Sequence, residues 1–232
     1  MTEHAIALTH VAFEDAGLLA GVLAARGVGL ATHPAWEIPG EAAEAPLVIL
    51  LGGPISANDT AAYPFLKDEI ALAERRMADG LPTLGICLGA QIMARAIGGT
   101  VGPGATEIGW APVELTEAGR ASVLAPLDDR PVLHWHGEVC TLPDGIENLA
   151  ATPACAAQAF VPAPGALALQ FHAEAGADGI EPWLVGHAVE IAATPGTDVP
   201  GLRADTARHG PALAPAARAM FERWLDRVGV AP

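Results

Sequence analysis

Short, continuous apolar runs alternate along this chain with longer stretches that have helical periodicity. Residues 47–51 are all apolar and end at Gly52, which is typical of a strand buried on both faces of a parallel sheet. Residues 64–79 then carry apolar positions at helical spacing, and residues 82–86 and 88–97 repeat the strand and the helix. This β-α-β-α order predicts a doubly wound α/β sheet.

The rest of the chain extends this pattern at its N-terminal end and departs from it after about residue 110. The other predicted elements are strands near 5–9, 29–32, 111–115, 132–135 and 166–171, and helices near 14–26, 180–192 and 212–228. We therefore expect a flavodoxin-like α/β fold, with a mostly parallel central sheet and helices on both faces. The expected organisation is a single domain over residues 1–232, with a helical C-terminal extension from about residue 195.

Composition narrows the class of protein. Hydrophobic residues make up 51% of the chain and charged residues 17%, which is typical of a globular domain. The formal net charge of −15 argues against binding to nucleic acid or to anionic lipid. Three scattered cysteines, no apolar run of about 20 residues and an acidic N-terminus without a basic secretory segment lead us to expect a reduced, cytoplasmic protein.

The sequence Gly-Ile-Cys-Leu-Gly at residues 85–89 lies between a predicted strand and a predicted helix. This is the form of a nucleophile elbow, in which a tight turn projects a nucleophile from the carboxyl edge of the sheet. Cys87 would then lie at a helix N-terminus, where the partial positive charge favours a thiolate. The alternative is a buried, inert core cysteine.

A thiolate nucleophile needs a base, an orienting group and donors for an oxyanion. His172 and Glu174 are two residues apart on a predicted strand, so both side chains can face one pocket. The backbone N–H of Leu88 and the turn at Gly53 are the candidate oxyanion donors. Each piece also has a simpler reading, as a surface His–Glu pair and as an ordinary turn after a strand.

Taken together, these pieces resemble the class I, triad-type glutamine amidotransferases. The resemblance covers nearly the whole chain. Within the family, the chain is most similar to free-standing domains like the glutaminase part of GMP synthase. The motifs that carry it are GGPIS at 52–56, LGICLGAQ at 84–91, EIGW at 107–110, HWHGE at 134–138 and QFHAE at 170–174.

The resemblance implies a reaction and a role for each matching residue. Cys87 would attack a glutamine side-chain amide, His172 would act as general base and acid, and Glu174 would orient it. Ammonia would leave, and water would hydrolyse a γ-glutamyl thioester. The other implied site residues are Gly53 and Leu88 for the oxyanion and Gln91, His136 and Gly137 for the substrate. If the ammonia is used, its expected acceptor is a separate synthetase, and the oligomeric state is not predicted.

Two positions depart from the family pattern, and one segment admits another chemistry. Ala173 stands where the family usually has proline, and Glu138 where it often has aspartate. His134, His136 and Glu138 would share one face of an extended segment, which also suits a metal site. No further ligand clusters beside them in the sequence and the resemblance accounts for the segment, so we expect neither a metal nor a cofactor.

Other functions remain open at the level of the sequence. A stand-alone γ-glutamyl hydrolase or peptidase would use the same triad without a partner. A non-catalytic regulatory module would keep only the fold, although the intact Cys87, His172 and Glu174 argue against it. A further analogue is the group of small α/β cysteine proteins with peptidase or chaperone roles.

Overall fold

The computed structural model describes residues 4–230; the first three and last two residues of the predicted domain lie outside the described residues. Eight strands form one sheet in the order β2-β1-β3-β4-β10-β9-β8-β6. Its first five strands are parallel: β2 (Gly29–Pro34), β1 (His4–Thr9), β3 (Val48–Leu50), β4 (Thr83–Ile86) and β10 (Ala166–Leu169). Antiparallel strands complete it: β9 (Ala159–Val161), β8 (Glu147–Ala151) and β6 (Glu114–Leu115).

Helices cover both faces of the parallel strands because successive side chains point to opposite sides. On β1, Ala5 and Ala7 pack into one apolar core, while Ile6 and Leu8 pack into the other. The first core includes apolar residues of α1 (Gly17–Ala25) and α7 (Val199–Val228), and the second those of α2 (Phe65–Ala78) and α3 (Leu88–Ala96). The predicted flavodoxin-like α/β fold is confirmed.

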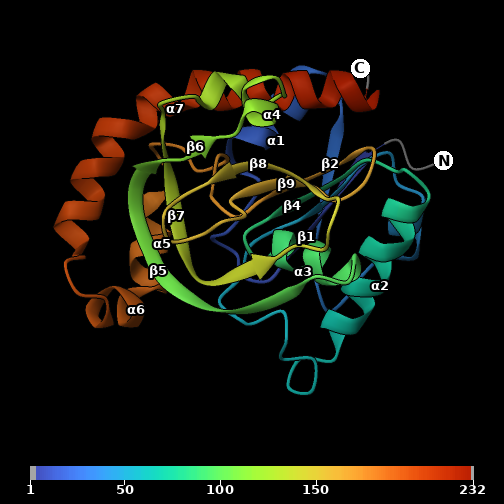
Figure 1. Cartoon of the computed structure of the whole chain (residues 1–232), viewed down its shortest axis with the longest axis horizontal. Helices are drawn as coiled ribbons and strands as arrows, with labels where there is room; N and C mark the ends of the chain where they lie inside the picture. The colour runs from blue at the N-terminus through green and yellow to red at the C-terminus, as the bar shows by residue number, and fades with distance from the viewer. Residues whose placement is uncertain (1–3, 231–232) are drawn as a thin grey trace.

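The region after residue 100 differs from the sequence expectation. The strand predicted near 111–115 is the end of a longer strand, β5 (Thr100–Pro112), followed by β6. β5 pairs antiparallel with β7 (Pro131–Thr141) in a separate ribbon that arcs along one side of the molecule (Figure 1). Pro112 pairs with Pro131, and because proline has no N–H the hydrogen-bonded ladder ends there.

The C-terminal helices also differ from their predicted bounds. The helix predicted at 180–192 is interrupted at His187, which separates α5 (Ile180–Gly186) from α6 (Ala188–Ala193). The helix predicted at 212–228 belongs to α7, which has 30 residues and runs up the left side and then along the top of Figure 1. Its prolines obscured its length in the sequence, but its N-terminus is capped by the Asp198 side chain, which accepts the Gly201 N–H at 2.6 Å.

Short helical turns complete the described chain: Gly40–Ala43, α4 (Glu117–Arg120) and Ala125–Leu127. Across residues 4–230, no helix combines the length and apolar character needed to cross a membrane.

Candidate active site

Cys87 occupies a strained turn between β4 and α3. Its backbone has φ 51° and ψ −107°, a combination that residues with a side chain rarely adopt. Glycine is required nearby, because a Cβ at Gly89 would lie 1.9 Å from the carbonyl oxygen of Leu50. The strain and the close approach of β3 to α3 are the geometry expected of a nucleophile elbow.

His172 and Glu174 follow β10, the parallel neighbour of β4, so the triad candidates come from adjacent strand ends. His172 Nδ1 lies 2.6 Å from Glu174 Oε1, and both side chains are buried. The backbone N–H of His172 donates to the Leu133 carbonyl at 2.8 Å, which fixes the backbone of this segment on β7. His172 Nε2 has no hydrogen-bond partner among residues 4–230, so it remains available for proton transfer.

The charges of this group depend on one another. Burial lowers the pKa of His172, but Glu174 and the adjacent Cys87 outweigh burial and hold this pKa well above its usual value. Burial raises the pKa of the Cys87 thiol, and contact with His172 opposes that rise. The cysteine also donates through Sγ to the Trp135 carbonyl at 3.5 Å. The resting pair therefore holds its protons to a higher pH than the isolated groups would.

The loop that carries Gly53 is held by a buried ion pair. His10 Nδ1 lies 2.9 Å from the Gly52 carbonyl oxygen, and His10 Nε2 lies 3.0 Å from Glu69 Oε2 on α2. Glu69 raises the pKa of His10 in spite of its burial. Leu88 opens the first turn of α3, where N–H groups have no intrahelical partner. Sequence reasoning missed His10 and Glu69, which are 59 residues apart.

A pocket of about 480 Å³ opens at Cys87. The predicted residues that line it are Gly53, Cys87, Gln91, His136 and Gly137. Leu88, His172 and Glu174 are buried and do not line it. The side-chain amide nitrogen of Gln91 donates to Gln170 Oε1 at 3.3 Å, and this hydrogen bond holds the orientation of the Gln91 side chain.

The pocket lining also contains residues that sequence reasoning missed. Glu14 lies 3.3 Å from His187 Nε2, and Glu190 accepts the indole N–H of Trp135 at 2.8 Å. His187 stands at the break between α5 and α6, and Glu190 belongs to α6. No motif marked these positions, because tertiary packing alone brings the junction of α5 and α6 to the pocket that Cys87 lines.

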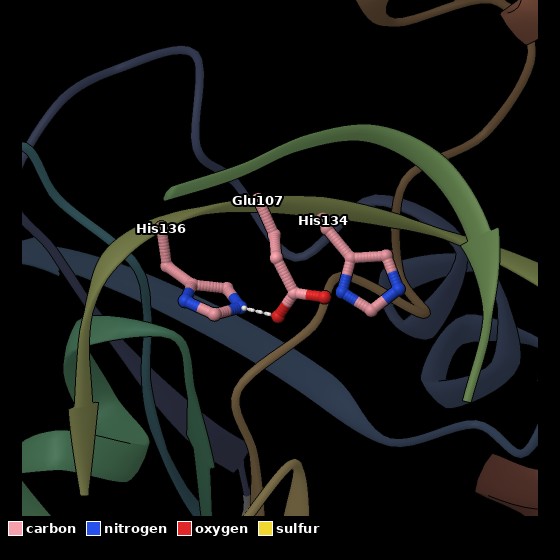
Figure 2. A group of neighbouring side chains, drawn as sticks. All are labelled: Glu107, His134 and His136. Atoms are coloured by element: carbon pink, nitrogen blue, oxygen red, sulfur yellow. Dashed lines mark ion pairs between the residues drawn. The ribbon is translucent and has the colours of Figure 1, made fainter. Parts of the chain in front are cut away.

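The HWHGE segment is arranged differently from the predicted face of His134, His136 and Glu138. The Glu138 carboxylate turns away and accepts a hydrogen bond from Ser56 Oγ at 2.9 Å. Its place beside the histidines is taken by Glu107, whose carboxylate lies between the two imidazoles (Figure 2). The sequence expectation that no other ligand clusters there was therefore wrong, because the antiparallel β5–β7 pairing sets Glu107 opposite His136.

Comparison with known proteins places this chain in a family. The family model described as "Glutamine amidotransferase class-I" matches residues 18–182. A solved glutamine amidotransferase from Thermotoga maritima superposes with a TM-score of 0.86 at 30% identity, over 97% of this chain and 99% of that one.

Several curated relatives are named as glutamine-hydrolysing GMP synthases. One from Streptomyces avermitilis is 36% identical over 115 residues, which are 49% of this chain and 21% of that protein. Another, from Methanoregula boonei, is one component of such an enzyme and is 40% identical over 98 residues, or 41% of this chain and 53% of that protein. The chain spans only 30% and 21% of the first two curated relatives. By its family match and its fold, the chain belongs to the class I glutamine amidotransferases.

Proposed function

We propose that this protein is a glutaminase that hydrolyses the side-chain amide of glutamine and releases ammonia. The observation that carries the proposal is the position of Cys87, in a strained elbow next to the buried His172–Glu174 pair and at the base of a pocket. A nucleophile, a base and a carboxylate that orients the base are the three parts of a catalytic triad for acyl transfer.

The first half of the proposed reaction breaks the amide. His172 Nε2 takes the thiol proton as Cys87 Sγ bonds to the amide carbon. The resulting oxyanion accepts hydrogen bonds from the backbone N–H groups of Gly53 and Leu88. His172 then gives its proton to the departing nitrogen, the carbon–nitrogen bond breaks, and ammonia leaves behind a γ-glutamyl thioester.

The second half restores the enzyme. His172 takes a proton from water, whose oxygen attacks the thioester carbon. The carbon–sulfur bond breaks, glutamate leaves, and the proton returns to Cys87. Throughout, the 2.6 Å contact between Glu174 and His172 Nδ1 holds the imidazole in the tautomer that presents Nε2 to sulfur and water. Gln91, His136 and Gly137 are the proposed contacts for the rest of the substrate.

The proposed destination of the ammonia is a separate synthetase. The relatives from Streptomyces and Methanoregula are named as glutamine-hydrolysing GMP synthases, which supports coupling to an amination step. The residues of the proposed site bind and hydrolyse glutamine, and none of them is proposed to transfer the ammonia to an acceptor. The proposal therefore includes a partner that supplies the ATP-dependent half of the reaction.

One observation favours a second function, a stand-alone γ-glutamyl hydrolase. The pocket of about 480 Å³ is in the range of sites that bury ligands larger than glutamine. Glu14, Glu138 and Glu190 contribute to its lining, so the extra space is acidic. A γ-glutamyl compound with an uncharged or cationic group on its amide nitrogen fits this space better than one with an anionic group.

A substrate panel tests both functions. Glutamate release is measured by an enzyme-coupled assay, with ammonia measured for glutamine, over γ-glutamyl peptides and γ-glutamyl amines, with and without ATP and candidate synthetases. Turnover of glutamine that rises with a partner supports the amidotransferase. Partner-independent turnover of the larger compounds supports the hydrolase. Both functions are contradicted if the parent protein turns over every substrate no faster than the Cys87→Ser variant does.

A further inference from the structure

A second buried polar cluster lies outside the proposed triad. Glu107 comes from β5, and His134 and His136 come from neighbouring positions of one face of β7. One ligand atom from each lies within 4.8 Å of the others, and Figure 2 shows the carboxylate between the two rings. The proposed reaction uses no side chain of Glu107 or His134.

The amide of Gln158 closes this cluster from a fourth direction. Its Nε2 lies 2.7 Å from Glu107 Oε2, 3.3 Å from His136 Nε2 and 3.5 Å from His134 Nδ1. Glu107 Oε2 and His136 Nε2 are 3.1 Å apart. A tetrahedral ion with bonds of about 2.0–2.1 Å has ligand atoms about 3.3 Å apart. The four separations given above, between 2.7 and 3.5 Å, are therefore close to that spacing, and the ligand atoms of Glu107, His134 and His136 all lie within 4.8 Å of one another.

Hydrogen bonding alone leaves this cluster incompletely satisfied. The Gln158 amide nitrogen has two protons, yet it faces Thr152 Oγ1 at 3.2 Å as well as the three groups above. Gln158 Oε1 is buried and has no partner among residues 4–230. A half-turn of the amide exchanges the two atoms and brings the unpaired oxygen into the cluster as a fourth ligand.

His134 already has the outer contact typical of a metal ligand. Its Nε2 lies 3.2 Å from the Ala111 carbonyl oxygen, to which it donates a proton, so the lone pair of Nδ1 faces the cluster. Metal-binding histidines are commonly fixed by a carbonyl in this way. His136 lacks such a contact, because its Nδ1 has no partner among the described residues.

We propose that Glu107, His134, His136 and Gln158 form a binding site for one divalent transition-metal ion, with Zn²⁺ as the best fit. The ligands are Glu107 Oε2, His134 Nδ1, His136 Nε2 and Gln158 Oε1. Two imidazoles with two oxygens in a tetrahedron suit Zn²⁺ better than Mg²⁺ or Ca²⁺, which prefer six or more oxygens.

The ion would tie three segments together beside the proposed active site. β5, β7 and the segment before β9 each contribute a ligand, and His136 also lines the pocket at Cys87. Binding of the ion would therefore make residues 134–138 more rigid, and the ion would make no contact with the reacting atoms. The proposed metal site is structural, and the proposed glutaminase chemistry does not depend on it.

Metal titration of the full chain tests the site directly. The Cys87→Ser variant is used as background, because a cysteine sulfur next to His172 is itself a candidate metal ligand. After treatment with EDTA and dialysis, Co²⁺ is added and the visible spectrum recorded, and Zn²⁺ affinity is measured by competition with a chromophoric chelator. We expect one Co²⁺ per chain with the intense absorption of a four-coordinate ion, displaced by Zn²⁺.

Substitutions separate a metal site from a hydrogen-bonded network. We expect His134→Ala to weaken Zn²⁺ binding at least 100-fold and the near-isosteric Glu107→Gln at least tenfold, while His33→Ala on β2 leaves it unchanged. Gln158→Glu adds a carboxylate at the fourth position, so it should lower the melting temperature without metal and bind Zn²⁺ at least tenfold more tightly. Absence of saturable binding, or equal affinity in Glu107→Gln and the background, would overturn the proposal.

Discussion

At the scale of single residues, the proposed chemistry depends on how Cys87, His172 and Glu174 share protons. Burial alone would favour a neutral thiol and a neutral imidazole, but the Glu174 carboxylate raises the pKa of His172. The thiol pKa is also raised, so a neutral-pH enzyme holds a proton that must leave before sulfur can attack. The pH at which that proton leaves is a measurable property of the triad.

The first prediction concerns this pH dependence. Because both pKa values are raised, kcat/KM should increase with pH, with its acidic limb centred above 6.5, the ordinary value for histidine. Glu174→Gln removes the charge that raises the His172 pKa, so the limb should move to lower pH while the plateau falls about 10²–10⁴-fold. A pH profile of γ-glutamyl turnover measures both. An acidic limb at the same pH in the variant would contradict the assigned role of Glu174.

At the scale of secondary-structure elements, buried polar pairs hold the loops around the elbow. His10 joins the end of β1 to α2 through Glu69 and to the Gly53 loop through the Gly52 carbonyl. Glu69 overcomes the burial of His10 and raises its pKa, so the pair contributes most when His10 is protonated. This contribution is complete below the ordinary histidine value of 6.5 and is lost as pH rises through the raised pKa.

The second prediction is that the stabilisation by the His10–Glu69 pair decreases as the pH rises. Glu69→Gln should destabilise the fold by about 2 kcal/mol at pH 6, because it weakens a buried charged hydrogen bond, and by clearly less at pH 9. Urea unfolding of the variant and the parent at both pH values measures the difference. The matched control is Glu74→Gln, an exposed position on the same helix, which should change neither value. A penalty for Glu69→Gln that is equal at both pH values would contradict the proposed charge state.

Contacts between segments that are distant in the sequence were the part of the structure that the sequence did not predict. The Cys87 elbow was predictable because strand, turn and helix are contiguous, so local patterns record them. The Glu107 cluster was not, because a register shift between Pro103 and Glu107 decides which side chain of β5 meets His136. His10 and Glu69 are likewise joined only by the packing of α2 against the sheet, which no periodicity in the sequence records.

At the scale of the whole molecule, α7 completes the core over one face of the sheet. Its residues Leu213, Ala217 and Trp224 are buried in the same cluster as β1 and α1, and Figure 1 shows α7 running past α1. The family match ends at residue 182, so α7 lies outside the matched region. We infer from its packing that α7, predicted as a C-terminal extension, is an integral part of the domain.

The third prediction tests that inference. Trp224→Ala removes a buried aromatic side chain and should cost about 3–5 kcal/mol, which lowers the melting temperature by roughly 10 °C. Arg223→Ala is the control, because this neighbour is exposed. Deletion of residues 197–232 should prevent cooperative unfolding altogether. A truncated protein that melts at the temperature of the parent would show that α7 is a dispensable appendage.

The central claim, that Cys87 carries the γ-glutamyl group, is tested most directly by trapping the acyl-enzyme. The protein is mixed with the best substrate of the panel, quenched in acid within the first turnover, digested and analysed by mass spectrometry. We expect a γ-glutamyl group on the peptide that contains Cys87, absent in Cys87→Ser and removed by hydroxylamine. Substrate turnover with no adduct at any quench time, or an adduct confined to Cys140 or Cys155, would contradict it.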